Sequence, residues 1–161
     1  MGRNLISIGL ISDTHGLLRK EAMRALEGSD LIIHAGDIGD PKIIDALKTL
    51  APVVAVRGNI DSEPWTSALR ETEVVEAGSA TIHVLHDVHA LDLNPAAGSN
   101  IVVSGHSHKP ACEKHDGVLY INPGSARPRR FQLPMTLARL NLNQIPWKIE
   151  FVDLCGGAVK D

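Results

Sequence analysis

The chain has 161 residues, of which 43% are hydrophobic and 22% charged, and its formal net charge is -3. This composition is typical of one globular domain, here spanning residues 1–161, whose core is large enough to fold without disulfides or a structural metal. The mildly acidic balance excludes the broad basic surface that binds duplex nucleic acid or an anionic membrane.

The two cysteines and the apolar segments set the expected compartment. Cys112 and Cys155 are far apart and form no paired motif, which is typical of a reducing environment. The longest apolar stretch near the start, residues 5–11, is far shorter than the roughly 20 residues of a membrane span. We therefore expect a cytoplasmic protein that does not enter a membrane.

The first third of the chain alternates between strand-like and helical patterns. Apolar runs at residues 5–11, 31–33 and 53–56 flank helical patterns at 18–26 and 41–50. That order predicts a βαβαβ unit with parallel strands.

The rest of the chain contains little helical pattern. Strand-like runs occupy residues 74–77, 81–85, 101–104, 118–121, 135–142 and 147–154, and turn signals between several of them predict hairpins. We expect an α/β fold of two stacked mixed β-sheets flanked by helices, the first sheet built on the βαβ units and the second mostly antiparallel.

Polar side chains stand at the ends of five of these runs. In open α/β sheets, ligands bind at the carboxyl ends of the strands, so these side chains should converge. The candidates are Asp13, His15, Asp37, Asn59, His86, His106 and His108.

This set favours a pair of divalent metal ions. Carboxylate, amide and imidazole ligands without thiolate favour cations such as Mn, Fe or Zn. A structural zinc site would instead be rich in cysteine. Seven ligands exceed what one tetrahedral ion takes, whereas one bridging carboxylate would give each of two ions four contacts. The bridge must be an aspartate, and we assign it to Asp37 because that residue follows the middle strand of the predicted order.

The sequence also resembles the calcineurin-like metallophosphoesterases, within them the small bacterial and archaeal phosphodiesterases related to the retromer subunit Vps29. The resemblance covers most of the chain. It implies that Asp13, His15 and His108 bind one metal, that Asn59, His86 and His106 bind the other, and that Asp37 lies between them. It rests on the segments Ser12-Asp13-Thr14-His15-Gly16, His34-Ala35-Gly36-Asp37-Ile38, Val56-Arg57-Gly58-Asn59-Ile60-Asp61, Gly105-His106-Ser107-His108 and Ile121-Asn122-Pro123-Gly124-Ser125.

Two positions depart from that family pattern. Asp87 follows His86 where similar proteins usually have Gly, which leaves His83 and His89 as alternatives to His86, although strand alternation puts His86 on the face of Ile82. Ile60 follows Asn59 where larger relatives place a histidine that could serve as a general acid.

Other polar residues have less specific interpretations. His34 reads as a satisfied core or supporting histidine, and His83, His89 and His115 as surface or sheet residues. Asp61 either orients a ligating imidazole or holds a turn. Arg127, Arg129 and Arg130 could reach phosphate, but solvated loop arginines are the more ordinary reading, and Ser107 lacks the nucleophile-elbow pattern of a serine hydrolase.

The function that follows is metal-dependent hydrolysis of phosphate diesters by activated water. We expect two divalent ions, first Mn2+ with Fe, Zn or Ni as alternatives, and a small anionic phosphate ester as substrate; a homo-oligomer stays open. The competing interpretation is a non-catalytic interaction module like Vps29, with a vestigial metal site. Retention of all seven ligands favours the enzyme.

Overall fold

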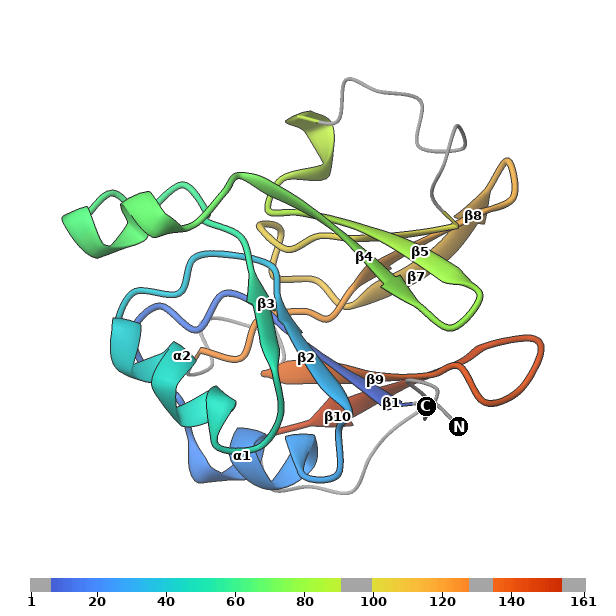
Figure 1. The fold of residues 1–161 in the computed structure, drawn as a ribbon, viewed down its shortest axis with the longest axis horizontal. Coiled ribbons are helices and arrows are strands. Elements are labelled where there is room, and N and C mark those ends of the chain that lie inside the picture. Colours follow the sequence, from blue (N-terminus) through green and yellow to red (C-terminus); the bar gives the residue numbers. More distant parts are fainter. Residues whose placement is uncertain (1–6, 91–99, 128–134, 155–161) are drawn as a thin grey trace.

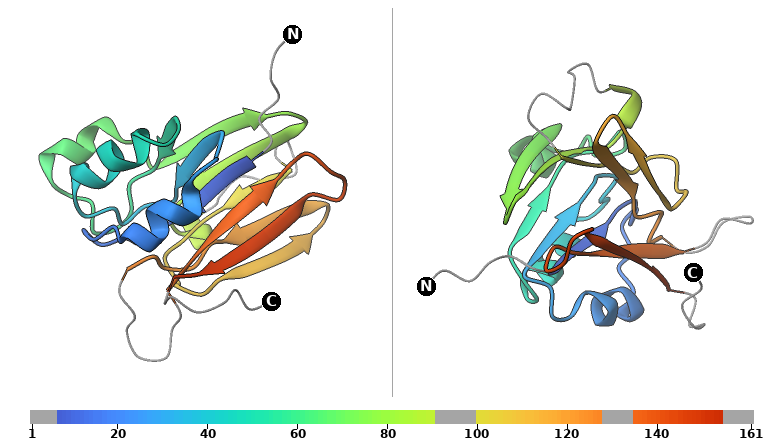
Figure 2. Two further views of the ribbon diagram at one scale, coloured as in Figure 1. Left: turned by 90° about the horizontal axis from the view of Figure 1, so that it is seen from below. Right: turned by 90° about the vertical axis from the view of Figure 1, so that its right-hand side faces the viewer.

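Two five-stranded β-sheets stack face to face in the computed structural model, which describes residues 7–90, 100–127 and 135–154 (Figures 1 and 2). The two-sheet α/β architecture predicted from the sequence is therefore confirmed. Within the described residues, no helix is both long and apolar enough to cross a membrane.

The first sheet has the strand order β10-β9-β1-β2-β3. Strands β1 to β3 are parallel and joined by two helices, as the alternating pattern predicts, while β9 pairs antiparallel with both β1 and β10. The elements are β1 (Ser7–Ile11), α1 (Lys20–Leu26), β2 (Leu31–His34), α2 (Pro41–Lys48), β3 (Val53–Ala55), β9 (Thr136–Asn141) and β10 (Lys148–Asp153).

The second sheet has the order β4-β5-β6-β8-β7 and is not mostly antiparallel. Two of its pairings are parallel, β5 with β6 and β6 with β8, because β7 lies inside the connection between β6 and β8 and pairs at the outer edge. The elements are β4 (Thr72–Ala77), β5 (Ala80–Leu85), β6 (Ile101–Val103), β7 (Ala111–His115) and β8 (Val118–Asn122), with short 3-10 helices η1 (Pro64–Ala68) and η2 (Val88–Ala90).

Strand β7 was not predicted, because its side chains carry no apolar signal. All five of its residues are exposed, and only the turn that follows it could be read from the sequence. An edge strand that buries nothing shows neither an apolar run nor alternation.

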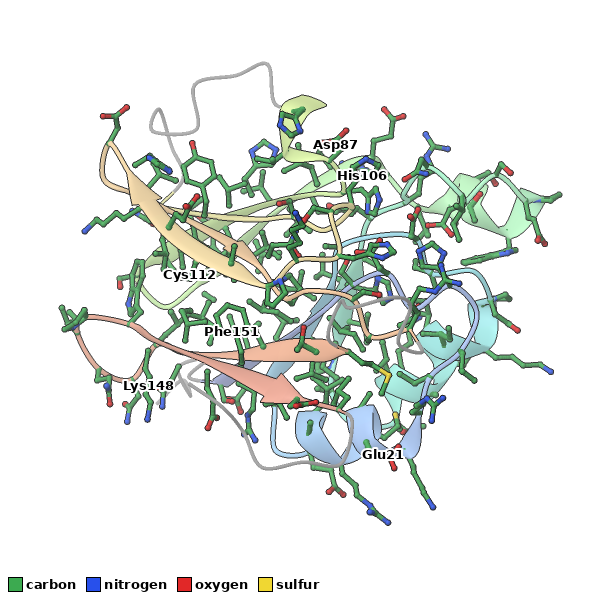
Figure 3. The ribbon with its side chains drawn as sticks, turned by 180° about the vertical axis from the view of Figure 1, so that it is seen from behind. Glu21, Asp87, His106, Cys112, Lys148 and Phe151 are labelled. Atoms are coloured by element: carbon green, nitrogen blue, oxygen red, sulfur yellow. The ribbon has the colours of Figure 1, made fainter. Side chains whose placement is uncertain are left out.

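The core divides between two interfaces because side chains alternate along each strand. Ile8 and Leu10 of β1 face the second sheet, whereas Ile11 faces the helices. Helix α2 starts at Pro41, with the Asp40 side chain accepting the Lys42 N–H at 2.9 Å, and buries Ile43 and Leu47 on the outer face of the first sheet. Figure 3 shows the aromatic ring of Phe151 between the two sheets.

His34 ends β2 and is fully buried. Its Nδ1 accepts the Gly36 N–H at 3.1 Å, and its Nε2 lies 3.0 Å from Thr14 Oγ1, whose hydroxyl proton goes to the Ile38 carbonyl at 2.8 Å. Nε2 must therefore supply the proton to Thr14, which makes His34 a neutral imidazole. Burial lowers the pKa of His34 from 6.5 to about 4.

This buried histidine predicts a loss of stability in acid. Between pH 6.5 and about 4 the unfolded chain takes up a proton at His34 that the folded chain refuses, so the free energy of unfolding falls as pH falls. The full window corresponds to about 3 kcal/mol. We expect His34→Gln, measured by denaturant unfolding in chelator, to remove much of the pH dependence. The matched variant His115→Gln, on exposed β7, should keep it; equal slopes in all three proteins would contradict the assignment.

Candidate metal centre

The seven predicted ligands converge at one end of the sandwich, where the carboxyl ends of β1, β2 and β3 meet those of β5 and β6. Asp13 and Asp37 are buried, with residue exposures of 0% and 3%, and His86 is 6% exposed. Three elements of the first sheet thus supply oxygen ligands, and two strands of the second sheet supply imidazoles.

The buried carboxylates lie close to three imidazoles. Asp13 Oδ1 is 3.3 Å from His108 Nε2 and 3.7 Å from His15 Nε2. Asp37 Oδ2 is 3.2 Å from His86 Nε2 and 3.5 Å from His15 Nε2. Two compact groups result, Asp13 with His15 and His108, and Asp13 with Asp37 and His86, in each of which the ligand atoms lie within 4.8 Å of one another.

Asn59 and His106 complete the arrangement on the side of His86. The Nδ1 atom of His106 is 3.2 Å from Asn59 Oδ1, and the rings of His86 and His106 meet edge to face with centroids 5.2 Å apart. The structure therefore brings the seven predicted residues together: Asp13, His15 and His108 form one compact group, and Asn59 and His106 lie on the side of His86.

These separations suit atoms that share an ion. Two ligand atoms bound about 2.1 Å from one ion lie roughly 3.0 to 3.4 Å apart, depending on the coordination angle. The shortest carboxylate–imidazole distances, 3.2 and 3.3 Å, fall in that range.

Three buried atoms at the centre have no hydrogen-bond partner among the described residues: Asp13 Oδ1, His15 Nε2 and His86 Nε2. A buried polar atom without a partner is costly, and such atoms call for a structural explanation. All three point into the same space, so a cation there would satisfy them together. The residues present fit a metal.

The electrostatics of the centre follow from its crowding. Burial acts to raise the pKa of Asp37, but the His86 imidazole 3.2 Å away and the Ile60 N–H outweigh burial and leave that pKa below its ordinary value. For His86, burial acts to lower the pKa, yet the neighbouring Asp37 carboxylate and the Ala35 carbonyl raise it overall. Burial lowers the pKa of His108.

Five of the seven residues adopt a left-handed backbone conformation. Positive φ angles occur at Asp13 (56°), His15 (49°), Asp37 (56°), His106 (74°) and His108 (64°). For residues other than glycine this costs about 1–3 kcal/mol each and persists only where the surroundings enforce it, commonly at functional sites. The turns aim successive side chains inward from the strand ends.

A hydrogen-bond framework holds these turns, and the sequence did not reveal it. Asp13 Oδ2 accepts the Ser12 hydroxyl at 2.7 Å and the His106 N–H at 3.1 Å, and Ser125 Oγ donates to the Asp13 carbonyl at 3.1 Å. Asn122 Nδ2 donates to the Gly105 carbonyl at 2.9 Å. The segment containing Asn122 and Ser125 was visible only as a family match, with no role attached.

Glycines let the loops approach one another. A Cβ on Gly58 would collide with the Asp37 carboxylate, and a Cβ on Gly105 would collide with Ser12 Oγ and lie 2.6 Å from Asp13 Oδ2. Backbone therefore packs closely against Asp37 Oδ1 and Asp13 Oδ2, whereas the other oxygen of each carboxylate faces the imidazoles.

Two other sequence interpretations can be decided from the contacts. Asp61 accepts the N–H groups of Ile38, Gly39 and Gly58 at 2.8–3.1 Å, so it joins two ligand loops through their backbone and orients no imidazole directly. Ser107 Oγ accepts from Asn122 Nδ2 at 3.1 Å and the Lys109 N–H at 3.2 Å. These donors occupy the oxygen that a serine hydrolase would need.

The remaining histidines lie away from the centre. His83 is on the face of β5 opposite Ile82 and Val84, and pairs across the sheet with Val74 and Val102. The side chain of His89 is 90% exposed in η2. His115 is exposed on β7.

Arg127 is less solvated than the loop sequence indicates. Its Nε is buried and has no hydrogen-bond partner within residues 7–90, 100–127 and 135–154, and its charge contributes, after burial and the neighbouring His15, to the lowered pKa of His108. Arg127 therefore lies on the His108 side of the centre, and Arg129 and Arg130 fall outside the described residues.

Comparison with known proteins agrees with this geometry. A calcineurin-like phosphoesterase superfamily domain matches residues 6–144. The chain belongs to the calcineurin-like phosphoesterase superfamily. Among its relatives in this superfamily is a probable metallophosphoesterase of Methanocaldococcus jannaschii, 36% identical over 73% of this chain and 67% of that protein.

Two further proteins are similar to this chain, one in sequence and one in fold. A phosphodiesterase of Methanocaldococcus jannaschii is 30% identical over 74% of this chain and 83% of its own length. Wild-type Vps29 of Entamoeba histolytica, solved in a complex with zinc, superposes with a TM-score of 0.79 at 23% identity and covers 96% of both chains. At that identity the Vps29 likeness concerns the fold alone.

The orientation of β5 yields a prediction about metal binding. We expect His86→Ala to weaken binding of one Mn2+ equivalent by at least about tenfold, measured by isothermal titration calorimetry on protein with unchanged circular dichroism, because the His86 imidazole points at Asp37. His83→Ala and His89→Ala should titrate like the wild type. Loss of a metal in His89→Ala with full binding in His86→Ala would show the assignment to be wrong.

Proposed function

We propose that the protein is a dinuclear metal-dependent phosphodiesterase. Asp13, His15 and His108 would hold one divalent ion, Asn59, His86 and His106 the other, and Asp37 would bridge them. The observation that supports this most directly is the convergence of three unpartnered buried ligand atoms, Asp13 Oδ1, His15 Nε2 and His86 Nε2, on one space.

The position of Asp37 supports its role as the bridge. Its Oδ2 lies between His15 of one subset and His86 of the other, at 3.5 and 3.2 Å. Its Oδ1 is held by the Ile60 N–H at 3.0 Å, which fixes the carboxylate between the two groups. Asp13 Oδ1 also approaches His86 Nε2, at 3.9 Å, but its other oxygen is engaged by Ser12 and His106.

The ligand set leaves a charge that attracts phosphate. Asp13 and Asp37 supply two formal negative charges against the four positive charges of two divalent ions, and the imidazoles and Asn59 bind as neutral ligands. When bound, such ions attract phosphate oxygens and lower the pKa of water toward about 7, which makes it a nucleophile at neutral pH. A phosphodiester, as a monoanion, suits the excess positive charge of an otherwise mildly acidic protein. Mn2+ fits this oxygen and nitrogen set, as do Fe, Zn and Ni.

Diester specificity is supported by the relatives named phosphodiesterases and by the place of Ile60. The side chain of Ile60, 41% exposed beside Asn59, has no proton to donate to a departing oxygen. A substrate whose leaving group needs little protonation is therefore favoured.

The alternative is an interaction module without catalysis, since Vps29 shares the fold. One experiment separates the two functions: a scaffold has no requirement for metal-dependent turnover, whereas the enzyme must lose activity with its metal.

We expect purified protein to hydrolyse bis(p-nitrophenyl) phosphate with Mn2+, to lose that activity in chelator, and to regain it on adding metal back. Far-ultraviolet circular dichroism should persist in chelator, because hydrogen bonds within the protein hold the ligand loops. Asp37→Asn should lower kcat/KM by at least about 100-fold, since it weakens both ion sites at once. Asp116→Asn, in the exposed β7–β8 turn, serves as the control. Full turnover by metal-stripped protein would refute the proposal.

A second prediction concerns the leaving group. A positioned general acid contributes about 10²- to 10⁴-fold and helps basic leaving groups most, so without a histidine at position 60 aryl diesters should react far faster than alkyl diesters. The measurement is kcat/KM across diesters of graded leaving-group pKa at saturating Mn2+. Ile60→His should improve alkyl esters more than aryl esters. A flat dependence, with chemistry rate-limiting, would mean that another acid protonates the leaving oxygen.

A further inference from the structure

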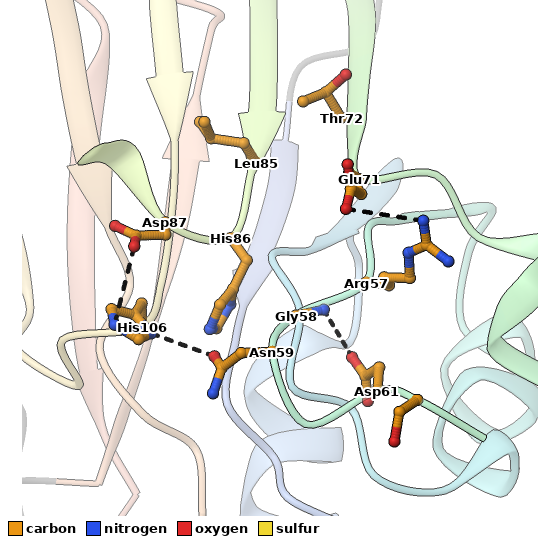
Figure 4. A pocket seen from close by; sticks show the side chains of 11 residues that line it. Arg57, Gly58, Asn59, Asp61, Glu71, Thr72, Leu85, His86, Asp87 and His106 are labelled. Atoms are coloured by element: carbon orange, nitrogen blue, oxygen red, sulfur yellow. Dashed lines mark hydrogen bonds and ion pairs between the residues drawn. The ribbon is translucent and has the colours of Figure 1, made fainter. Parts of the chain in front are cut away.

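A cavity of about 670 Å³ opens beside the centre on the side of Asn59, His86 and His106. It extends away from the buried carboxylates toward the start of β4 (Figure 4). A diester bound at the centre carries two organic groups, and this cavity is large enough for one of them.

Charged side chains line two sides of this cavity. Arg57 stands on one side, but Glu71 faces it with 3.8 Å between Nη2 and Oε1, so the two charges largely cancel a few Å away. The carboxylate of Asp61 is buried and accepts hydrogen bonds from backbone N–H groups. The cavity therefore offers a substrate no unopposed positive side chain among the described residues.

Asp87 stands on the opposite side and keeps its negative charge. Its Oδ1 accepts the His89 N–H at 3.0 Å and lies 3.2 Å from His89 Nδ1, and its Oδ2 lies 4.0 Å from His106 Nε2 (Figures 3 and 4). In the described part of the chain, no lysine or arginine approaches it within 4 Å, and its side chain is 38% exposed. An ordinary carboxylate so exposed is ionised at neutral pH.

We propose that this cavity holds the second ester group of the phosphodiester and that Asp87 selects against an anionic group there. The substrates would be diesters of uncharged or cationic polar alcohols, and not diesters that carry a second phosphate or a carboxylate. This rests on the proposed function and specifies its substrate class. Ser62, Thr72 and Asn59 line the same cavity and can hydrogen-bond to hydroxyl groups.

Coulomb's law gives the expected size of the selection. A unit charge about 6 Å from Asp87, at an effective dielectric constant of roughly 40 to 80, changes binding about three- to tenfold. Because the cavity is open to solvent, added salt should reduce the effect.

The test uses three p-nitrophenyl diesters of similar size that share one leaving group. Their second alcohols are choline, its uncharged isostere 3,3-dimethylbutanol, and 4-hydroxybutanoate. For the wild type with saturating Mn2+ we expect kcat/KM to fall in that order, by about three- to tenfold per step. Asp87→Asn should compress the series, whereas Arg57→Gln, which leaves Glu71 unopposed, should steepen it. Glu76→Gln, exposed on β4 outside the cavity lining, is the matched control.

A binding measurement accompanies the kinetics. Calorimetry with phosphocholine and with 3,3-dimethylbutyl phosphate should show the same preference for the ammonium compound, and its loss in Asp87→Asn. Ratios within each variant are compared, so an overall change in metal occupancy cancels.

The outcomes distinguish this inference from the proposed function. Absence of turnover with all esters and with bis(p-nitrophenyl) phosphate would sink both. Turnover with equal rates along the series, or a preference for the anionic ester, would overturn the selection by Asp87 alone. A uniform loss in Asp87→Asn with unchanged ratios would show that Asp87 positions His106 and does not select the substrate.

Discussion

The buried carboxylate of Asp13 joins the two halves of the molecule. It follows β1 in the first sheet, yet one of its oxygens accepts the His106 N–H from the loop after β6 in the second. Its backbone carbonyl accepts from Ser125, and its N–H donates to the Gly36 carbonyl at 2.9 Å. The remaining oxygen, Oδ1, has no hydrogen-bond partner in the part of the chain that the structure describes, and it points at three imidazoles. One residue thus sets the spacing of the loops and leaves a ligand atom free.

The strained left-handed backbone at the centre persists because several hydrogen bonds fix the position of each ligand loop. Asp13 and Asp37 have left-handed backbones, and the residues before and after each of them are hydrogen-bonded to the adjacent loop. His86 Nδ1 also lies 2.8 Å from the Ala35 carbonyl of the other sheet. Because Nδ1 is bonded to that carbonyl, Nε2 is the nitrogen that remains available to a metal ion. The protein thereby selects both the direction and the tautomer of a proposed ligand without any ion.

The features of the fold and the site that could be predicted from the sequence are those that leave a pattern in a short stretch of the chain. The βαβαβ unit was predicted because apolar periodicity and Pro41 are local, and the seven site residues because strand ends in an open α/β sheet meet at one edge. Strand β7 was missed because its exposed residues carry no periodicity. The parallel pairing of β6 with β8 was missed because the crossover that produces it contains a strand, not the helix that usually indicates one. The contacts of Asp61, Asn122 and Ser125 join residues far apart in sequence, and nothing in the chain near them records the partner.

Because hydrogen bonds within the protein hold the ligand loops, fold and chemistry are separable in this architecture. The hydrogen bonds of Asp13 and Asp61 lie within the protein and include no cation, so the stacked sheets do not depend on a bound ion. This explains how Vps29, at 23% identity, can share the architecture while its likeness decides nothing about catalysis here. The function is better judged from the unpartnered ligand atoms and from the side chains that line the cavity beside them. Asp87 is the informative case: it lines that cavity outside the proposed ligand set, beside His89 and His106, so its charge reaches both the cavity and the edge of the proposed centre.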